Sequence, residues 1–294
     1  MNRRTFLSTS ASLLAGSALL ADDAKPKLKK AVKYGMIGPG KTVKDKFELI
    51  KSIGFLGVEI DSPSSLNLDE ANAAQKDTGI KIHGVIDSVH WNSTHALSHP
   101  DEKVRAKGLE ALLKAIEDAE KVGADTVLLV PGVVREETFN GKKEKVTYEQ
   151  CYERSQAEVK KAIPAAEKAK VRVAIEVVWN NFITKPEQLV QYVDDFKSEW
   201  VGAYFDCSNM IKYGVAPADW IRKLGKRMLK FDFKGYSKSK QWVGVGEGDE
   251  DWPEILKALA EVGYNGWATA ELGRLDEKAL RELSAKMDDI LGLK

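Results

Sequence analysis

Short apolar runs rich in β-branched residues alternate, from residue 32 onward, with longer stretches in which apolar residues recur at helical spacing. The short runs predict strands at 32–37, 57–61, 81–87, 126–130, 171–178, 201–206, 228–233 and 267–271. The longer stretches predict helices at 43–53, 68–78, 102–122, 147–169, 186–197, 217–224, 251–262 and 276–290. Such alternation indicates parallel strands joined by helical crossovers.

The number and order of these elements predict the fold class. Eight strands and eight helices fit a single-domain α/β protein, a closed (β/α)8 or TIM barrel. Glycine follows several predicted helices, where a left-handed C-terminal cap favours it, as at Gly79 and Gly123. The alternative is an open doubly wound sheet, which usually has a glycine-rich turn after its first strand. Residues 38–41 (Gly-Pro-Gly-Lys) fit neither that turn nor a P-loop.

The N-terminus differs from the rest of the chain. Arg3 and Arg4 precede Thr-Phe-Leu, a short apolar stretch rich in small residues at 13–21, and an acidic pair. This order is typical of a secretory signal, here of the twin-arginine type, and the protein is expected to be exported to the periplasm. An arginine pair present by chance on an ordinary secretory signal is the alternative. The expected organisation is a signal peptide at 1–23, a linker at 24–31 and the barrel at 32–294.

Composition limits the classes of partner. The formal net charge of +1 gives no electrostatic reason to expect nucleic acid or an anionic membrane as a partner. The apolar stretch at 13–21 is too short to span a bilayer, so no stable membrane insertion is expected after signal removal. Cys151 and Cys207 are far apart and form no CxxC pattern, so neither a disulfide framework nor a thiolate metal site is predicted. A homo-oligomer remains open.

One acidic residue stands near the end of each of the last four predicted strands: Glu176, Asp206, Asp232 and Glu271. Active sites of such barrels lie where the strands run out into the following loops. A single acid there could simply reach solvent or cap the next helix. Neighbouring strands lie about 4.8 Å apart, so four acids can converge. Buried together, they would repel one another unless protonated or bridged by a cation, and an all-oxygen set favours Mn²⁺, Mg²⁺ or Ca²⁺.

With these acids in place, residues 32–291 resemble the xylose isomerase-like TIM barrel superfamily of sugar isomerases and epimerases. In that family the metal is held by a Glu, an Asp, usually a His, and a Glu from the last four strands. Glu176, Asp206 and Glu271 match three of these positions, and Asp232 stands where the histidine is expected. The segments 244–249 and 263–267 also match the family's last crossover. The resemblance implies one divalent ion, with Mn²⁺ or Mg²⁺ favoured and Co²⁺, Zn²⁺ or Ca²⁺ as alternatives.

The resemblance also implies a reaction. A sugar isomerase or epimerase removes a proton next to a carbonyl through a metal-stabilised enediolate. Glu176 and Glu271 would then transfer protons as well as hold the metal, whereas Asp206 and Asp232 would mainly hold it. Export and the lack of a glycine-rich phosphate loop favour a non-phosphorylated small-molecule sugar or derivative. A lyase that opens 3-keto-glycosides by β-elimination would use the same site. A non-catalytic sugar-binding barrel is the third alternative, suggested by the departures from histidine at Asp232 and Asn209.

Further side chains are expected near the same mouth. The substrate-binding candidates are Glu59, taken as the end of its strand, and His90, Trp91, Asn209, Lys234 and Lys238. The two lysines could equally be ordinary surface charges. Trp179 follows Glu176 and is placed to floor a sugar pocket. Of the other histidines, His83 is expected to be structural, and His95 and His99 to be solvated. This histidine pattern argues against the three-metal DNA-repair endonuclease branch.

Overall fold

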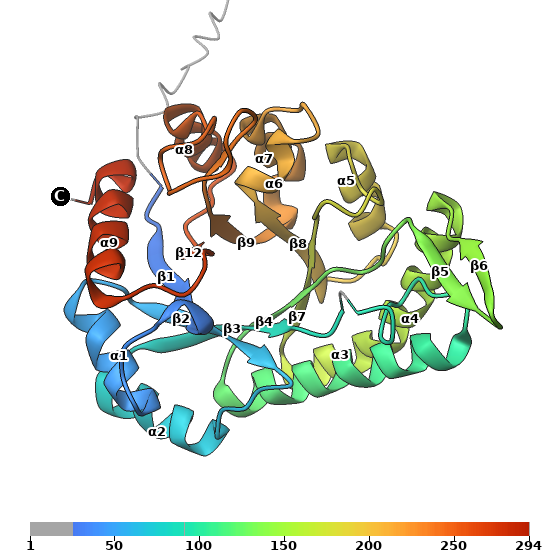
Figure 1. Ribbon diagram of the computed structural model, residues 1–294, viewed down its shortest axis with the longest axis horizontal. Helices are drawn as coiled ribbons and strands as arrows, with labels where there is room; N and C mark the ends of the chain where they lie inside the picture. The colour runs from blue at the N-terminus through green and yellow to red at the C-terminus, as the bar shows by residue number, and fades with distance from the viewer. Residues whose placement is uncertain (1–25, 91, 294) are drawn as a thin grey trace, which may run out of the picture.

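The computed structural model describes residues 26–90 and 92–293, so the expected signal peptide at 1–23 lies outside the described residues. Eight parallel strands close into a barrel: β1 (Lys29–Lys33), β2 (Gly57–Ser62), β3 (Lys81–Asp87), β4 (Thr126–Leu129), β7 (Arg172–Glu176), β8 (Val201–Asp206), β9 (Met228–Phe233) and β12 (Trp267–Ala270). Their spatial order follows the chain, and β1 pairs with β12 to complete the circle (Figure 1). The predicted fold class, a single-domain TIM barrel, is confirmed.

The predicted helices surround this barrel within one to three residues of their expected bounds. They are α1 (Val43–Ser52), α2 (Leu68–Thr78), α3 (Glu102–Val122), α4 (Tyr148–Ala169), α5 (Pro186–Asp194), α7 (Pro217–Leu224), α8 (Trp252–Glu261) and α9 (Glu277–Leu291). Local sequence sets their ends. Thr42 and Thr147 form capping boxes with Asp45 and Gln150, which satisfy the first free N–H groups of α1 and α4. At the other end of α3, Gly123 has the left-handed conformation expected of a C-terminal cap.

The first strand begins earlier than the sequence indicated. The prediction was a strand at 32–37 after a linker at 24–31, but β1 covers Lys29–Lys33, and a 3-10 turn (Tyr34–Met36) follows. The error arose because lysine was taken to mean solvent. Lys30 is buried and its ammonium lies 2.5 Å from Asp288 on α9, and Leu28 is buried as well. The end of the expected linker is therefore part of the barrel wall, held there by the last helix.

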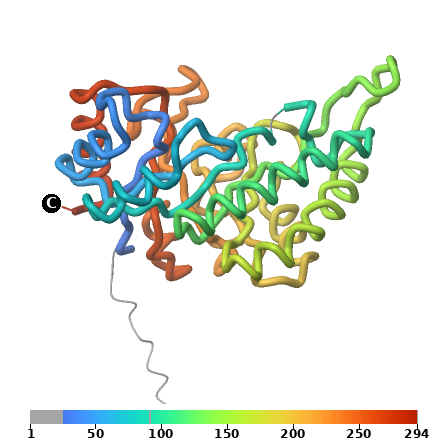
Figure 2. Tube along the Cα trace, turned by 90° about the horizontal axis from the view of Figure 1, so that it is seen from below, coloured from blue at the N-terminus to red at the C-terminus, as the bar shows by residue number. Residues whose placement is uncertain are grey.

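Four short strands, one short helix and a second 3-10 turn, Gly225–Arg227, were not predicted. Two strands, β5 (Glu136–Phe139) and β6 (Lys142–Lys145), form a hairpin that stands out from the body beyond α3 and α4 (Figures 1 and 2). Another hairpin, β10 (Tyr236–Ser237) with β11 (Gln241–Trp242), follows β9. A short helix, α6 (Cys207–Ile211), begins directly after β8. Both hairpins and α6 lie in loops after barrel strands, the regions in which TIM barrels carry function.

The apolar core fills the space between the strands and the surrounding helices. Phe47 on α1, Tyr192 on α5 and Trp220 on α7 are fully buried there. The barrel interior is different, because charged and polar side chains from β1, β2, β8 and β9 are buried inside it. Among the described residues, no helix is both long and apolar enough to cross a membrane. The barrel therefore keeps a polar centre within an apolar shell.

Candidate metal centre

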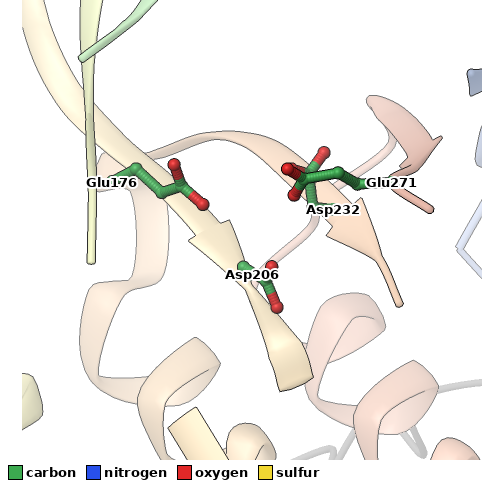
Figure 3. A group of neighbouring side chains, drawn as sticks. All are labelled: Glu176, Asp206, Asp232 and Glu271. Atoms are coloured by element: carbon green, nitrogen blue, oxygen red, sulfur yellow. The ribbon is translucent and has the colours of Figure 1, made fainter. Parts of the chain in front are cut away.

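The four acids predicted from the strand ends come together. Glu176 ends β7, Asp206 ends β8, Asp232 is the penultimate residue of β9, and Glu271 directly follows β12. One carboxylate oxygen from each lies within 4.8 Å of the other three, and Figure 3 shows the side chains gathered at one end of the barrel. Asp206 and Asp232 occupy paired positions on neighbouring strands, so strand register alone brings them side by side. We call these four residues the carboxylate cluster.

Asp206 has two roles, one for each carboxylate oxygen. Its Oδ1 accepts hydrogen bonds from the backbone N–H groups of Ser208, at 2.8 Å, and Asn209, at 2.9 Å, and so caps α6. Its Oδ2 is directed to the cluster, 3.1 Å from the ammonium of Lys234. The cap fixes the carboxylate and the helix N-terminus favours its negative charge. The sequence had offered capping and metal binding as alternatives, and the geometry allows both.

Glu176 is almost fully buried at the end of β7. Burial, together with the charges of Glu271 and Asp206, raises its pKa well above the usual value. Asn209 on α6 approaches it, with 3.4 Å between Asn209 Nδ2 and Glu176 Oε1, and donates to the carbonyl of Val177 at 3.2 Å. The predicted placement of Asn209 beside the cluster is therefore observed.

Asp232 has a cationic neighbour that the sequence analysis missed. Lys33, the last residue of β1, is buried with its ammonium 3.1 Å from Asp232 Oδ2 and 2.5 Å from Glu59 Oε2. Tyr204 OH lies 2.7 Å from Asp232 Oδ1 and 2.9 Å from Glu59 Oε2. Burial lowers the pKa of Lys33, but Asp232 and Glu59 outweigh burial, so the pKa is raised well above the usual value. Lys33 therefore carries a positive charge into the barrel interior.

Glu59 does not end its strand, as the sequence analysis assumed. It lies in the middle of β2, which continues to Ser62, and its side chain is 1% exposed. Its carboxylate contacts Lys33 and Tyr204, and its Oε1 lies 3.7 Å from His83 Nδ1. This position supports Lys33 and Asp232 from within the barrel. The predicted contact between Glu59 and substrate stays a prediction. The burial of Glu59 argues against it, because a substrate in the barrel mouth could not easily reach this carboxylate.

Glu271 is the most accessible member of the carboxylate cluster, with 33% of its side chain exposed. Burial acts to raise its pKa, but the cations of Lys33 and Lys234 outweigh burial and hold the pKa at about 2. Lys234, just after β9, lies 2.8 Å from Glu271 Oε2 and 3.1 Å from Asp206 Oδ2. Burial lowers the pKa of Lys234, but the charges of Asp206 and Glu271 outweigh burial, so the pKa is raised above its usual value. The predicted placement of Lys234 at the site is observed.

The carboxylate cluster fits a divalent metal ion. Its acids are oxygen donors, three of the four are buried, and they outnumber the nearby lysine ammonium groups. Burial raises the pKa of Asp232 well above its usual value, as it does for Glu176, so the cluster resists full ionisation unless a cation stabilises it. Each carboxylate oxygen has two lone pairs, so contacts with Lys33 or Lys234 leave acceptor capacity for a metal.

Three predicted substrate-binding residues remain: His90, Lys238 and Trp91. His90 is buried behind the mouth, and its Nδ1 accepts from the backbone N–H of Val130 at 3.2 Å; burial, with the charge of Lys33, lowers its pKa to about 3. Lys238 is exposed in the turn between β10 and β11. Trp91 lies outside the described residues.

The other histidines follow the predictions in part. His83 is structural, as expected, because it is buried and stacks on Trp267 with the ring centres 4.3 Å apart. His99 is buried, and its Nδ1 accepts from the backbone N–H of Asp101 at 2.9 Å, so the expectation that it is solvated is wrong. His95 is partly exposed.

Strand periodicity could have found two of the missed residues. Tyr204 stands two positions before Asp206, and alternate residues of a strand face the same side. Lys230 stands two before Asp232 in the same way and is buried beside His83, 2.9 Å from its carbonyl oxygen. Lys33 gave no comparable signal, because its partners come from β2, β8 and β9 and only the closed barrel brings them together.

The fold and the site together define a class of protein. It is a TIM barrel with a cluster of acids, from consecutive strand ends, that fits a divalent metal ion. The chain belongs to the family described as the xylose isomerase-like TIM barrel, whose model matches residues 47–289. The sequence is 27% identical over 182 residues to MJ1311, an uncharacterized protein of Methanocaldococcus jannaschii, and the match covers 58% of each chain. The chain thus spans somewhat over half the length of that relative.

Two further comparisons reach more of the chain. L-ribulose-5-phosphate 3-epimerase UlaE of Escherichia coli K12 is 25% identical over 237 residues, covering 76% of this chain and 79% of UlaE. The crystal structure of the 3-keto-D-glucoside 4-epimerase YcjR from Escherichia coli has a TM-score of 0.74 and 17% identity, and covers 90% of this chain and 99% of YcjR. The YcjR likeness shows the shared fold.

Proposed function

We propose that this protein is a divalent-metal-dependent sugar isomerase or epimerase that moves a proton at a carbon next to a carbonyl. One observation carries the proposal: four acids from β7, β8, β9 and the end of β12 place carboxylate oxygens within 4.8 Å of one another. They do so at the end of the barrel where active sites of this fold lie. UlaE and YcjR, both named as sugar epimerases, support the same class of reaction.

The carboxylate cluster would hold the ion. A bound divalent ion supplies positive charge that stabilises the enediolate formed when the proton leaves. We favour Mn²⁺ or Mg²⁺, because all four proposed ligands are carboxylates, with Co²⁺, Zn²⁺ or Ca²⁺ as alternatives.

Glu271 and Glu176 are the proposed proton-transfer pair. The cations of Lys33 and Lys234 keep Glu271 ionised, so its carboxylate can accept a proton. Glu176 contributes a carboxylate oxygen to the same cluster, from which it would return the proton. Asn209 beside Glu176 and Lys234 beside Glu271 are placed to orient these carboxylates and to contact substrate hydroxyls.

The proposed substrate is a non-phosphorylated sugar or sugar derivative. We propose that residues 1–23 direct export to the periplasm, and phosphorylated sugars are mainly intracellular. The same proton abstraction also permits β-elimination from a 3-keto-glycoside, and the likeness to YcjR, named for a 3-keto-glucoside, keeps that lyase as the second candidate. Both reactions start with the same loss of a proton, so one experiment tests their common step.

Deuterium uptake from solvent into the sugar measures that step directly. Protein supplied with Mn²⁺ would be incubated in D₂O with free ketoses and with methyl 3-keto-glucoside, and the sugars analysed by NMR. We expect exchange at the carbon next to the carbonyl, reduced about 10²- to 10⁴-fold in Glu271→Gln. Glu282→Gln is the matched control, because Glu282 is exposed on α9. No exchange with any of these sugars, or full exchange in Glu271→Gln, would contradict the proposal.

A further inference from the structure

Three aromatic rings lie together beside the carboxylate cluster. Trp179, in the loop after β7, stacks on Trp242 of β11 with ring centres 4.8 Å apart and planes 16° from parallel. Tyr236 of β10 meets both tryptophans edge-on, at 5.0 Å from Trp179 and 5.2 Å from Trp242. We call Trp179, Tyr236 and Trp242 the aromatic platform. These offset and edge-on contacts are the favoured arrangements of aromatic rings.

The aromatic platform is fixed to the elements that carry the carboxylate cluster. Trp179 Nε1 donates to the backbone carbonyl of Asn209 on α6 at 2.9 Å. The buried carboxylate of Glu250 accepts from the backbone N–H of Tyr236 at 2.7 Å and from Ser208 Oγ at 2.6 Å. The β10–β11 hairpin is therefore anchored to α6, whose first turn is capped by Asp206. A ring surface held in this way is preorganised, which reduces the loss of freedom on binding.

Lys234 connects the aromatic platform to the carboxylate cluster. Its ammonium lies 4.8 Å from the centre of the Trp242 ring and 2.8 Å from Glu271 Oε2. These two distances limit the separation between the Trp242 ring and Glu271, because both lie close to the same ammonium. The ring and the carboxylate cluster are therefore within reach of one two-ring sugar.

Trp242 keeps an open surface despite its contacts. It is 47% exposed, although its ring touches Trp179 and Tyr236. The other large apolar side chains with comparable exposure among the described residues are leucines, which single surface positions tolerate without a function. Trp242 differs from them because it is part of a three-ring group next to a charged site. An aromatic surface with a few placed polar groups is typical of a ligand site.

We propose that the aromatic platform binds a second pyranose ring, so that the substrate is a keto-disaccharide or another keto-glycoside with a sugar as its aglycone. The apolar C–H face of a pyranose matches the exposed part of the Trp242 indole, and its hydroxyl groups can reach the Lys234 ammonium, which lies over the same ring. This inference rests on the proposed function, since it takes the keto-sugar ring to lie at the carboxylate cluster. It adds the class of sugar and the residue that selects it.

Equilibrium binding tests the subsite separately from turnover. Calorimetric titration with Mn²⁺ present would compare a keto-disaccharide, 3-keto-cellobiose, with methyl 3-keto-glucoside, which lacks the second ring. We expect the wild type to bind the disaccharide roughly 3- to 10-fold more tightly, the range of one aromatic contact. Trp242→Ala is expected to remove this preference while binding of the methyl glycoside stays unchanged. Trp242→Phe, which keeps a ring, should restore much of it.

Controls separate the outcomes. Leu56→Ala removes an exposed apolar side chain just before β2, at the opposite end of the barrel, and should leave the preference intact. An equal preference in wild type and Trp242→Ala, or none in the wild type, overturns the subsite. Tight binding of a phenyl keto-glucoside without any preference for 3-keto-cellobiose also overturns it, in favour of an aromatic aglycone. A preference that Trp242→Ala abolishes, with no deuterium exchange in any sugar, supports the subsite and contradicts only the catalytic proposal.

Discussion

The ammonium of Lys33 lies 3.1 Å from Oδ2 of Asp232, inside the barrel and away from solvent. Asp232 stands where the family resemblance led us to expect a histidine, so this site carries one more negative charge. Lys33 supplies a positive charge at that point, and Glu59 and Tyr204 share the same hydrogen-bond network. We infer that the charge of Lys33 stabilises the ionised carboxylate of Asp232 in the barrel interior.

Replacing Lys33 by methionine should destabilise the protein strongly. The substitution keeps the length of the side chain but leaves the carboxylates of Asp232 and Glu59 without their cation, and breaking a buried pair typically costs about 3–5 kcal/mol. Urea unfolding measures the change in free energy. Lys44→Met breaks an exposed pair with Asp77 and should change stability far less, because solvent screens that pair. Equal losses in the two variants would show that Lys33 has no special role.

Asp206→Asn should separate metal binding from helix capping. Asparagine is as good an N-cap as aspartate, so α6 should remain formed, whereas one carboxylate of the carboxylate cluster is lost. We expect Mn²⁺ affinity to fall by more than the roughly 10- to 100-fold usual for residues behind the ligands. Metal analysis after dialysis and calorimetric titration would show this. Asp69→Asn, at a side chain that is 79% exposed, should bind Mn²⁺ like the wild type; unchanged affinity in Asp206→Asn would remove Asp206 from the metal centre.

Lys234→Met should make the protein more dependent on metal for stability. The ammonium of Lys234 lies between Asp206 and Glu271, so its loss should cost roughly 1–3 kcal/mol. A divalent ion would restore the missing charge, so the rise in Tm on adding Mn²⁺ should exceed that of the wild type. Thermal unfolding with and without Mn²⁺ tests this. Lys238→Met, in the exposed turn nearby, should behave like the wild type, and an equal metal effect in Lys234→Met would contradict the charge argument.

Asp87 should make stability depend on pH outside the metal centre. Burial at the end of β3 raises its pKa to about 7. The folded state then binds a proton more tightly than the unfolded state, whose aspartate titrates near pH 4, so stability should fall as pH rises from about 4 to 7. The full effect is about 4 kcal/mol at most. Asp87→Asn should remove this fall, which urea unfolding at pH 5 and pH 8 would measure.

The comparison with Asp87→Asn has a clear negative outcome. If the wild type and Asp87→Asn lose the same stability between pH 5 and pH 8, other groups cause the change. Asp61→Asn is a useful second comparison, because burial also raises the pKa of Asp61, although Asp61 is an exposed residue near the end of β2. Its contribution should be smaller than that of Asp87.

Local pattern was sufficient for the fold and for the four acids. Each of Glu176, Asp206, Asp232 and Glu271 is flanked by apolar residues of its own strand, so its position near the strand end could be recognised without knowing any neighbour. Periodicity of two and of 3.6 residues likewise located the strands and helices, because both depend on residues close together in sequence. The convergence of the acids then followed from the geometry of parallel barrels alone.

What surrounds the acids depended on the tertiary structure. Tyr204 and Glu59 are 145 positions apart, and Lys33 reaches both only because β1 closes the barrel against β2 and β12. The β10–β11 hairpin and its stacking on Trp179 likewise appear only when the loop after β9 folds against α6. The sequence by itself determined the barrel and its carboxylates, since local apolar periodicity encodes both. The buried lysines and the aromatic platform were decided by the fold, because a charge or ring acquires its role from partners that are distant along the chain.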